Sequence, residues 1–339
     1  MSRPRASVGD RTKCNAQGST LGKQKQELMM QKFVLAGDLG GTKTLLAVAE
    51  MVDGIPRLVR EERFDSRTHD DFATLLEEFL KSVPAPIEAA CFGIAGPTDG
   101  FTAKLTYLPW YLDAAGLAAR FGIGRVLLVN DFFAAAHGIA LLQDDQIVTL
   151  QAGQPQPRAP RVVVGAGTGL GVAGLIWRGG HYAAIPGEGG HIGFAPQTPE
   201  QGELWRQLGA QFGRVTAEDI LSGIGLTRLY KFLGGVDKTP AEIGDAAVSG
   251  SDPRATQTLD LWLSIYGAFA GDLALLWMAR GGVYIAGGIA AKLMPQMRVA
   301  PFLTAFRAKR EYRALAETIP IRLVTEERLG LLGALSLAG

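Results

Sequence analysis

The chain has 339 residues, a formal net charge of +1, 47% hydrophobic residues and 20% charged residues. This composition excludes a disordered chain, and the balanced charge gives no general attraction to nucleic acid. The two cysteines, Cys14 and Cys91, cannot form a disulfide framework or a cysteine-rich zinc site, so we expect a reducing, cytoplasmic setting. No uninterrupted apolar run reaches the roughly 18 residues of a membrane helix, and no membrane span is expected.

Residues 1–32 differ from the rest of the chain. They are rich in Lys, Arg, Ser and Gln and contain only two acids, Asp10 and Glu27. They lack the apolar segment of a secretory signal. We expect a disordered N-terminal extension, read from an early start codon, with a transit peptide or an added leader as alternatives.

The first organised stretch, residues 33–50, predicts two strands around a tight turn. The turn consists of Gly37, Asp38, Leu39, Gly40, Gly41 and Thr42. Gly40 and Gly41 can take positive φ and expose N–H groups to an anion, and Thr42 adds a hydroxyl donor. A carboxylate repels phosphate unless a cation lies between them, so Asp38 is a candidate Mg²⁺ ligand, directly or through water. An ordinary hairpin turn is the alternative.

The next elements predict an α/β unit that opens with a three-stranded meander. We expect strands over residues 44–50, 57–64, 87–94 and 125–129, a helix over 70–81, and a helix capped by Asp113 that ends at Phe121. Asn130 and Asp131 follow the last of these strands, and binding residues of open α/β sheets occupy such carboxyl ends.

Asp131 is a candidate general base, because a carboxylate at this point can accept a proton from a substrate hydroxyl. A helix begins directly afterwards, so Asp131 could instead only cap that helix. Asn130 offers both a donor and an acceptor, which suits a sugar hydroxyl.

A second glycine-rich turn follows an expected strand over residues 161–164. It spans Gly165, Ala166, Gly167, Thr168, Gly169, Leu170 and Gly171. A dinucleotide fingerprint needs a helix after its glycines, but residues 172–177 have the pattern of a strand. Two Gly/Thr hairpins more than a hundred residues apart suggest two jaws that close on one polyphosphate.

Three further segments carry candidate ligand contacts. Glu188 and His191 lie in a glycine-rich loop, where they could grip a polyol; a zinc site is the weaker alternative. Glu218 reads as a first-turn helix acid. Gly287 and Gly288 follow a buried strand over 283–285 and could let the backbone approach a flat ring, or form a simple strand–helix turn.

The second half is otherwise mainly helical. We expect helices over residues 200–212, 216–221, 226–232, 241–249, 253–278 and 328–337.

From Phe33 onward the chain resembles the bacterial-type glucokinases of the hexokinase and actin-like ATPase superfamily. The segments that carry the resemblance are residues 37–42, 129–132, 165–171, 186–191, 221–226 and 286–289. The resemblance implies a two-domain α/β fold, actin-like and ribonuclease H-like. A small α/β domain would span 33–141, a larger α+β domain 142–330, and the C-terminal helix, 331–339, would pack back on the small domain across the cleft.

The resemblance also implies ATP-dependent phosphorylation of D-glucose to glucose 6-phosphate by a homodimer, with Asp131 as the general base and Mg²⁺ near Asp38. Glucose would contact Asn130, Asp131, Glu188, His191 and Glu218. ATP phosphates would lie over residues 37–42 and over Gly165, Gly167 and Thr168, and adenosine near Gly287 and Gly288.

The sequence leaves several alternatives open. Tyr107 stands where many relatives carry Asn, which puts one sugar contact in doubt. Another hexose, a non-catalytic sugar sensor or an actin-like filament protein would be rival functions. The related repressor/kinase family usually carries a cysteine-rich zinc motif after a Gly-His pair, and no cysteine follows His191.

Overall fold

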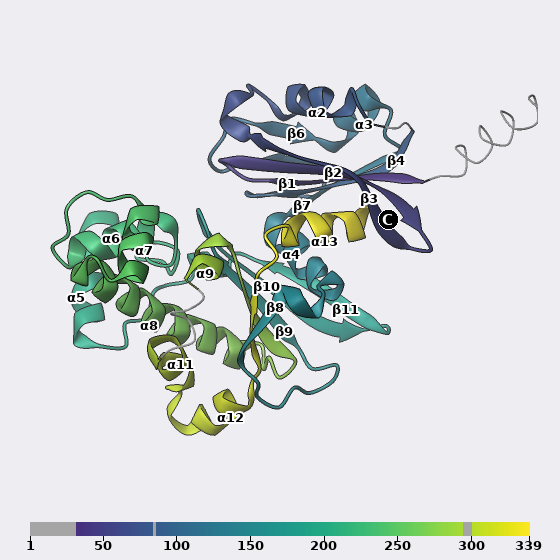
Figure 1. Ribbon diagram of the computed structural model, residues 1–339. Helices are drawn as coiled ribbons and strands as arrows, with labels where there is room; N and C mark the ends of the chain where they lie inside the picture. Colours follow the sequence, from purple (N-terminus) through teal and green to yellow (C-terminus); the bar gives the residue numbers. More distant parts are fainter. Residues whose placement is uncertain (1–31, 84–85, 294–299) are drawn as a thin grey trace, which may run out of the picture.

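The computed structural model describes residues 32–83, 86–293 and 300–339 and consists of two lobes, each built on one sheet (Figure 1). The predicted N-terminal extension falls outside the described residues except for Lys32. The first lobe carries a five-stranded sheet in the order β3-β2-β1-β4-β7. Its strands are β1 Phe33–Leu39, β2 Lys43–Val52, β3 Ile55–Asp65, β4 Ile87–Ile94 and β7 Arg125–Asn130.

The predicted opening meander is confirmed. β1 and β2 are antiparallel, as are β2 and β3, whereas β4 and β7 run parallel to β1 and to each other. Asp53 and Gly54 both have positive φ at the turn between β2 and β3, which matches the twist of a tight hairpin. Parallel strands bring their carboxyl ends to one edge, so the ends of β1 and β7 lie on the same side of the lobe.

Helices cover both faces of the first sheet. Helix α2 (Phe72–Leu80), capped by Asp71, and helix α3 (Ala114–Phe121), capped by Asp113, pack on one face of the sheet. An aromatic core lies between these helices and the sheet. Helix α4 (Asp131–Gly138) and helix α13 (Leu329–Ala338) cover the other face. α4 and α13 cross closely, because a Cβ atom at Gly333 would lie 1.7 Å from the carbonyl oxygen of Ala134.

The second lobe carries a six-stranded sheet in the order β11-β10-β9-β12-β13-β8. Its strands are β8 Ile147–Gln151, β9 Arg161–Ala166, β10 Leu170–Arg178, β11 His181–Gly187, β12 Gly282–Ala286 and β13 Ile321–Val324. Its helices are α5 Pro199–Phe212, α6 Gly223–Phe232, α7 Pro240–Ser249, α8 Pro253–Leu276, α9 Gly288–Lys292, α11 Ala300–Arg307 and α12 Arg313–Thr318. A short hairpin of β5 (Thr102–Lys104) and β6 (Tyr111–Asp113) completes the first lobe.

Helix α8 is the centre of the second lobe's core. Trp262 and Tyr266 of α8 are fully buried and pack with Phe302 of α11. Helix α8 has the length and the mean hydropathy (1.4) of a membrane span, but 72% of that window is buried inside the protein. Its apolar surface is therefore the core of a globular lobe.

Two parts of the sequence prediction need correction. Residues 216–221 form turns instead of a helix, and the N–H groups of Ala217 and Glu218 join them to the loop before them by donating to the carbonyls of Ile192 and Gly190, each at 2.9 Å. Residues 186–191 were predicted as a polar loop, but Pro186 and Gly187 are the last residues of β11, an edge strand, where the missing N–H of proline is tolerated. The lobe boundary near residues 141 and 142 stays a prediction.

Candidate active site

The first hairpin, between β1 and β2, is tied to its own lobe. The N–H of Gly40 donates to the carbonyl of Lys43 at 3.0 Å, and the hydroxyl of Ser66 donates to the carbonyl of Gly40 at 2.8 Å. The prediction of positive φ at Gly40 and Gly41 is wrong. Gly41 is instead required by contact, because a Cβ there would lie 2.7 Å from Cβ of Tyr107.

The second hairpin, between β9 and β10, is tied to segments beyond its own strands. The N–H of Gly167 donates to Gly169 O at 2.8 Å, and Gly167 O accepts the N–H of Gly223 at the start of α6 at 2.9 Å. Glu218 Oε2 accepts the N–H of Leu170 at 2.8 Å. A candidate sugar residue thus holds one end of a candidate phosphate turn.

Glycine is required at the positions of the second hairpin for different structural reasons. A Cβ at Gly171 would lie 1.8 Å from Cδ2 of Phe132, and one at Gly165 would lie 2.7 Å from its Cζ. These two glycines admit the Phe132 ring, which wedges the start of α4 against the hairpin. A Cβ at Gly167 would meet nothing within 4 Å, so this glycine is the one open to a ligand.

The sequence left open whether Asp131 acts on a ligand or only caps α4. Asn130 is the cap of α4: its Oδ1 accepts the N–H groups of Phe132 (3.0 Å) and Phe133 (3.1 Å). Asp131 Oδ1 also accepts the N–H of Phe132, at 2.8 Å. The second carboxylate oxygen of Asp131 has no hydrogen-bond partner among the described residues, and it is available to a ligand.

The electrostatics of the cleft favour a proton on Asp131. The pKa of the Asp131 carboxyl is raised to about 7, first by burial and then by the negative charges of Asp38 and Glu188, while the hydrogen bond from the N–H of Phe132 opposes this rise. Burial also raises the pKa of Asp38, against the opposing charge of Lys43. A carboxyl that titrates near neutrality can accept a proton late in a reaction at physiological pH.

A loop and a turn bring the candidate sugar residues together. The N–H of Glu218 donates to Gly190 O, which joins the segment 215–218 to the loop that carries Glu188 and His191. Tyr107 is 51% exposed, and burial followed by the charge of Glu218 raises its pKa. Carboxylates that accept from several sides suit a neutral, hydroxyl-rich ligand.

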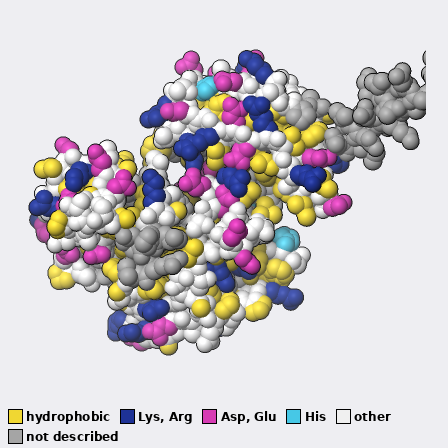
Figure 2. Space-filling view, in the orientation of Figure 1, with side chains coloured by type: hydrophobic (Ala, Val, Ile, Leu, Met, Phe, Trp, Pro, Cys, Tyr) yellow, Lys and Arg dark blue, Asp and Glu magenta, His cyan; other side chains and the backbone are white. Residues whose placement is uncertain are grey.

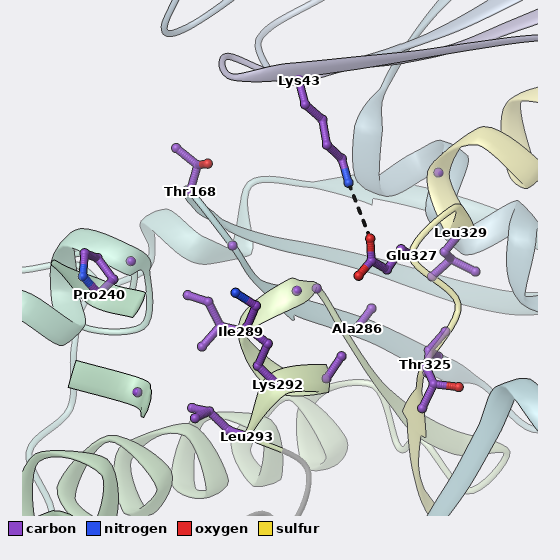
Figure 3. A pocket seen from close by; sticks show the side chains of 18 of the residues that line it. Lys43, Thr168, Pro240, Ala286, Ile289, Lys292, Leu293, Thr325, Glu327 and Leu329 are labelled. Carbon is purple, nitrogen blue, oxygen red and sulfur yellow. Dashed lines mark ion pairs between the residues drawn. The ribbon is translucent and has the colours of Figure 1, made fainter. Parts of the chain in front are cut away.

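A cavity of about 510 Å³ lies between the lobes (Figure 3). The predicted residues that line it are Asp38, Asp131, Gly167, Thr168, Gly287 and Gly288. Gly287 has a φ of +89° and a Cβ there would lie 2.4 Å from Ala166 O, so the turn itself requires glycine. Gly288 has open space before it and is the glycine that a flat ring could approach.

Other predicted residues do not reach this cavity. Gly37 and Leu39 pack inside the first lobe, where a Cβ at Gly37 would lie 2.7 Å from Phe92 Cδ1. Gly40, Gly41, Thr42 and Gly165 form the hairpins without lining it. The sugar candidates Asn130, Glu188, His191 and Glu218 also lie outside its lining. Asn130 directly precedes Asp131, and Glu188 is close enough for its charge to raise the pKa of Asp131.

Sequence reasoning missed an apolar wall and two lysines. Leu226, Pro240, Ile289 and Leu293 line the end of the cavity next to Gly288, a suitable surface for a flat ring. Lys43 and Lys292 also line it. Lys43 directly follows the predicted turn, and its position was the one available signal; the apolar residues come from three separate helices and share no local pattern.

The carboxylates fit Mg²⁺ held jointly with substrate. Within residues 32–83, 86–293 and 300–339, no three His, Cys, Asp or Glu side chains form a metal-binding group. Asp38 is partly buried, and Gly330 leaves room for its carboxylate at the first turn of α13, where a Cβ would lie 3.0 Å from Asp38 Cγ. One or two carboxylates that complete their coordination with phosphate and water are typical of Mg²⁺ sites.

Comparison with known proteins agrees with this geometry. A family model described as Glucokinase matches residues 35–339. The chain is 40% identical over 333 residues to a glucokinase from Nostoc sp., covering 89% of this chain and 97% of that protein. A glucokinase crystal structure from an Antarctic psychrotroph superposes with a TM-score of 0.78 at 28% identity, covering 91% and 98% of the two chains. A Balamuthia mandrillaris glucokinase in complex with glucose shares the fold, with a TM-score of 0.80 at 22% identity over 96% and 99%.

Proposed function

Since the chain belongs to the glucokinase family and is a glucose kinase, we propose that Asp131 is the general base that activates the 6-hydroxyl of D-glucose for attack on ATP. The observation that carries this proposal is the position of Asp131. Its carboxylate lies at the start of α4, lines the cavity between the lobes and keeps one oxygen without a partner in the described chain. The raised pKa, about 7, suits a group that takes a proton during the transfer.

The proposed transfer assigns one task to each part of the site. Glu188, His191 and Glu218 hold hydroxyls of the sugar, with Asn130 beside them, so that the 6-hydroxyl faces Asp131. The second hairpin holds the phosphates at Gly167 and Thr168, which line the cavity, and Asp38 faces them from the end of β1. As the new oxygen–phosphorus bond forms and ADP leaves, the hydroxyl proton passes to the Asp131 carboxylate. Most of the catalysis comes from positioning and charge compensation.

Asp38 is proposed to hold Mg²⁺, directly or through water. When bound, Mg²⁺ neutralises negative charge on the phosphate oxygens. Two acids with raised pKa values, Asp38 and Asp131, face the same cavity, so a cation there would also ease their mutual repulsion. Activity should therefore disappear with a chelator and return with excess Mg²⁺, measured by a coupled assay.

A panel of sugars tests the substrate. Turnover of glucose, mannose, fructose and N-acetylglucosamine should be compared at equal ATP, and kcat/KM should be highest for glucose. Phosphorylation of another hexose with a higher kcat/KM would replace glucose as the substrate. Absence of turnover on every sugar would contradict the proposal and favour the sensor or filament function.

We further propose a cytoplasmic homodimer. The cytoplasmic part is supported by Cys91, a buried cysteine outside any disulfide, whose pKa is raised to about 12 by burial so that it is unreactive. The homodimer is supported by the family resemblance. Sedimentation of the purified protein at several concentrations would measure the oligomeric state; a mass of one chain at all concentrations would contradict the dimer.

A further inference from the structure

Lys43 occupies a position to which none of the predicted functions is assigned. It is the first residue of β2, directly after the first hairpin. Thr44 is buried on the opposite face of the strand, where its hydroxyl meets that of Ser66 at 2.9 Å. Because side chains alternate along a strand, Lys43 shares a face with Leu45, which packs with the α13 cluster. Its side chain therefore extends into the space between the lobes (Figure 3).

The ammonium group of Lys43 faces Glu327. The distance from Nζ to Oε2 is 4.0 Å, and the two side chains are 35% and 69% exposed. Glu327 lies on the connector between β13 and α13, so the pair joins the first hairpin to the segment that links the lobes. An exposed pair at this distance shifts an equilibrium by about fivefold at most, so a stronger anion can replace the carboxylate.

The neighbouring ion pairs are very different. Arg328 donates from Nε and Nη2 to the two carboxylate oxygens of Glu326, each at 2.8 Å, and from Nη1 to Glu61 of β3 at 3.3 Å. These contacts raise the pKa of Arg328, with the hydrogen bonds to Glu326 as the largest cause. Gln146 also donates to Glu326, at 2.5 Å. The bidentate bond of Arg328 therefore lies within the connector. Its bond to Glu61, at 3.3 Å, ties the connector to the first lobe more closely than the Lys43–Glu327 pair, at 4.0 Å.

Lys43 and Glu327 stand where two cavities meet. Both residues line the 510 Å³ cavity and also a second cavity of about 410 Å³, which is lined further by Glu61, Arg63 and Arg328. In the space-filling view, charged side chains of both signs gather where the lobes meet (Figure 2). A change of partner by Lys43 would therefore take place at the wall of the nucleotide cavity.

The charge of the 510 Å³ cavity, which would hold the nucleotide, explains why Lys43 would change its partner. Its acidic lining includes Asp38, Asp131, Asp245, Glu326 and Glu327, against the two cations Lys43 and Lys292. Lys43 already lowers the pKa of Asp38, so it lies within electrostatic reach of the candidate Mg²⁺ ligand. A polyphosphate in this cavity carries more charge than the single carboxylate of Glu327 and would attract the ammonium group away from it.

We propose that Lys43 is a phosphate-positioning residue, held by Glu327 in the nucleotide-free protein and released to the outer phosphates of ATP when the nucleotide binds. This inference rests on the proposed function, since it assumes that the cavity holds the nucleotide. Glu327 then acts as an internal competitor that weakens ATP binding. The exchange loosens one link between the hairpin and the connector, while the Arg328 link stays in place.

The test is isothermal titration with two probes, a non-hydrolysable ATP analogue and AMP, in the presence of glucose. K43M should raise the Kd of the ATP analogue roughly tenfold and leave the Kd of AMP nearly unchanged, because a bond from an ammonium to a terminal phosphate is lost. K43R should restore most of the affinity. K32M is the matched control, since Lys32 forms an exposed pair with Glu88 at 3.0 Å at the other end of β1; it should change neither Kd.

The competitor is tested with Glu327. E327Q should lower the Kd of the ATP analogue about twofold to fivefold, and the gain should be smaller in the K43M background, where no pair is broken. An unchanged Kd for the ATP analogue in K43M, or equal weakening of AMP, would overturn the proposal, as would an equal gain from E327Q in both backgrounds. These titrations need no turnover, so they are distinct from failure of the wild-type protein to phosphorylate glucose.

Discussion

The two glycine hairpins looked alike in sequence and differ in how they are held. The β1–β2 hairpin is bonded to Ser66 of its own lobe and presents Lys43, a cation with a loose partner. The β9–β10 hairpin is bonded to Glu218 and to Gly223, at the sugar side and at the start of α6. Under the proposed function, the first hairpin would respond to the charge of the nucleotide through Lys43, whereas the second would couple the nucleotide to the sugar through Glu218.

Asp131 lies between the hairpins, and its removal should have the largest effect. D131N should lower kcat by roughly 10² or more and leave glucose binding largely intact, because the amide still accepts the Phe132 N–H but cannot take a proton. Steady-state kinetics and glucose titration measure the two effects. Near-normal turnover would remove Asp131 as the base and leave only the hairpins as the catalytic parts.

Two glycines of the second hairpin separate its structural role from its ligand role. G171A should destabilise the protein by about 3 kcal/mol, because the new Cβ would lie 1.8 Å from the Phe132 ring. G167A is the matched control: its Cβ meets nothing within 4 Å, so stability should hold while the KM for ATP rises. Denaturant unfolding and kinetics measure both, and equal stability of the two variants would refute the wedge by Phe132.

The buried carboxyl of Asp131 should lower the free energy of unfolding at high pH. The folded-state pKa of Asp131, about 7, exceeds the ordinary value of 3.8, so the folded protein binds more protons than the unfolded chain between these pH values. The Asp131 contribution to stability is therefore lost as pH rises from about 4 to 7. D131N should raise the unfolding free energy on the order of 2 kcal/mol at pH 8 and little at pH 4.

Chemical denaturation at both pH values checks this expectation. A stabilisation of D131N that is equal at pH 4 and pH 8 would mean that the charge of Asp131 is not its source.

If the second hairpin couples the two substrates, a change at Glu218 should weaken the binding of both glucose and ATP. E218Q should raise the KM for glucose and the KM for ATP, each roughly tenfold, because the amide weakens the bond to Leu170 N–H as well as a sugar contact. E188Q, from a loop without a bond to the hairpin among the described residues, should raise the KM for glucose alone. Parallel changes in both variants would show that Glu218 carries no special link.

Local patterns predicted the fold well where a residue's neighbours in sequence decide its structure. The meander, the strand before Asn130 and the cap at Asp113 follow from alternation and helix-start signals. The helix predicted over residues 216–221 is wrong: these residues form turns that are bonded to residues 190 and 192, and a local pattern contains no sign of that contact.

The site was predictable only in part for the same reason. Asp131 and the hairpins carry local signatures, but Gly171 is required by the ring of Phe132, 39 residues earlier, and the pairing of Lys43 with Glu327 joins residues near opposite ends of the chain. Asn130 was expected to bind sugar through both of its polar atoms; its oxygen is committed to the helix cap. Such contacts are tertiary, so spacing within the sequence does not contain them.

The most direct test is the crystal structure of the protein with glucose and a non-hydrolysable ATP analogue. We predict that a carboxylate oxygen of Asp131 lies about 2.6–3.2 Å from the 6-hydroxyl oxygen of glucose, with phosphates against both hairpins. A complex in which the Asp131 carboxylate points away from every sugar oxygen would contradict the account.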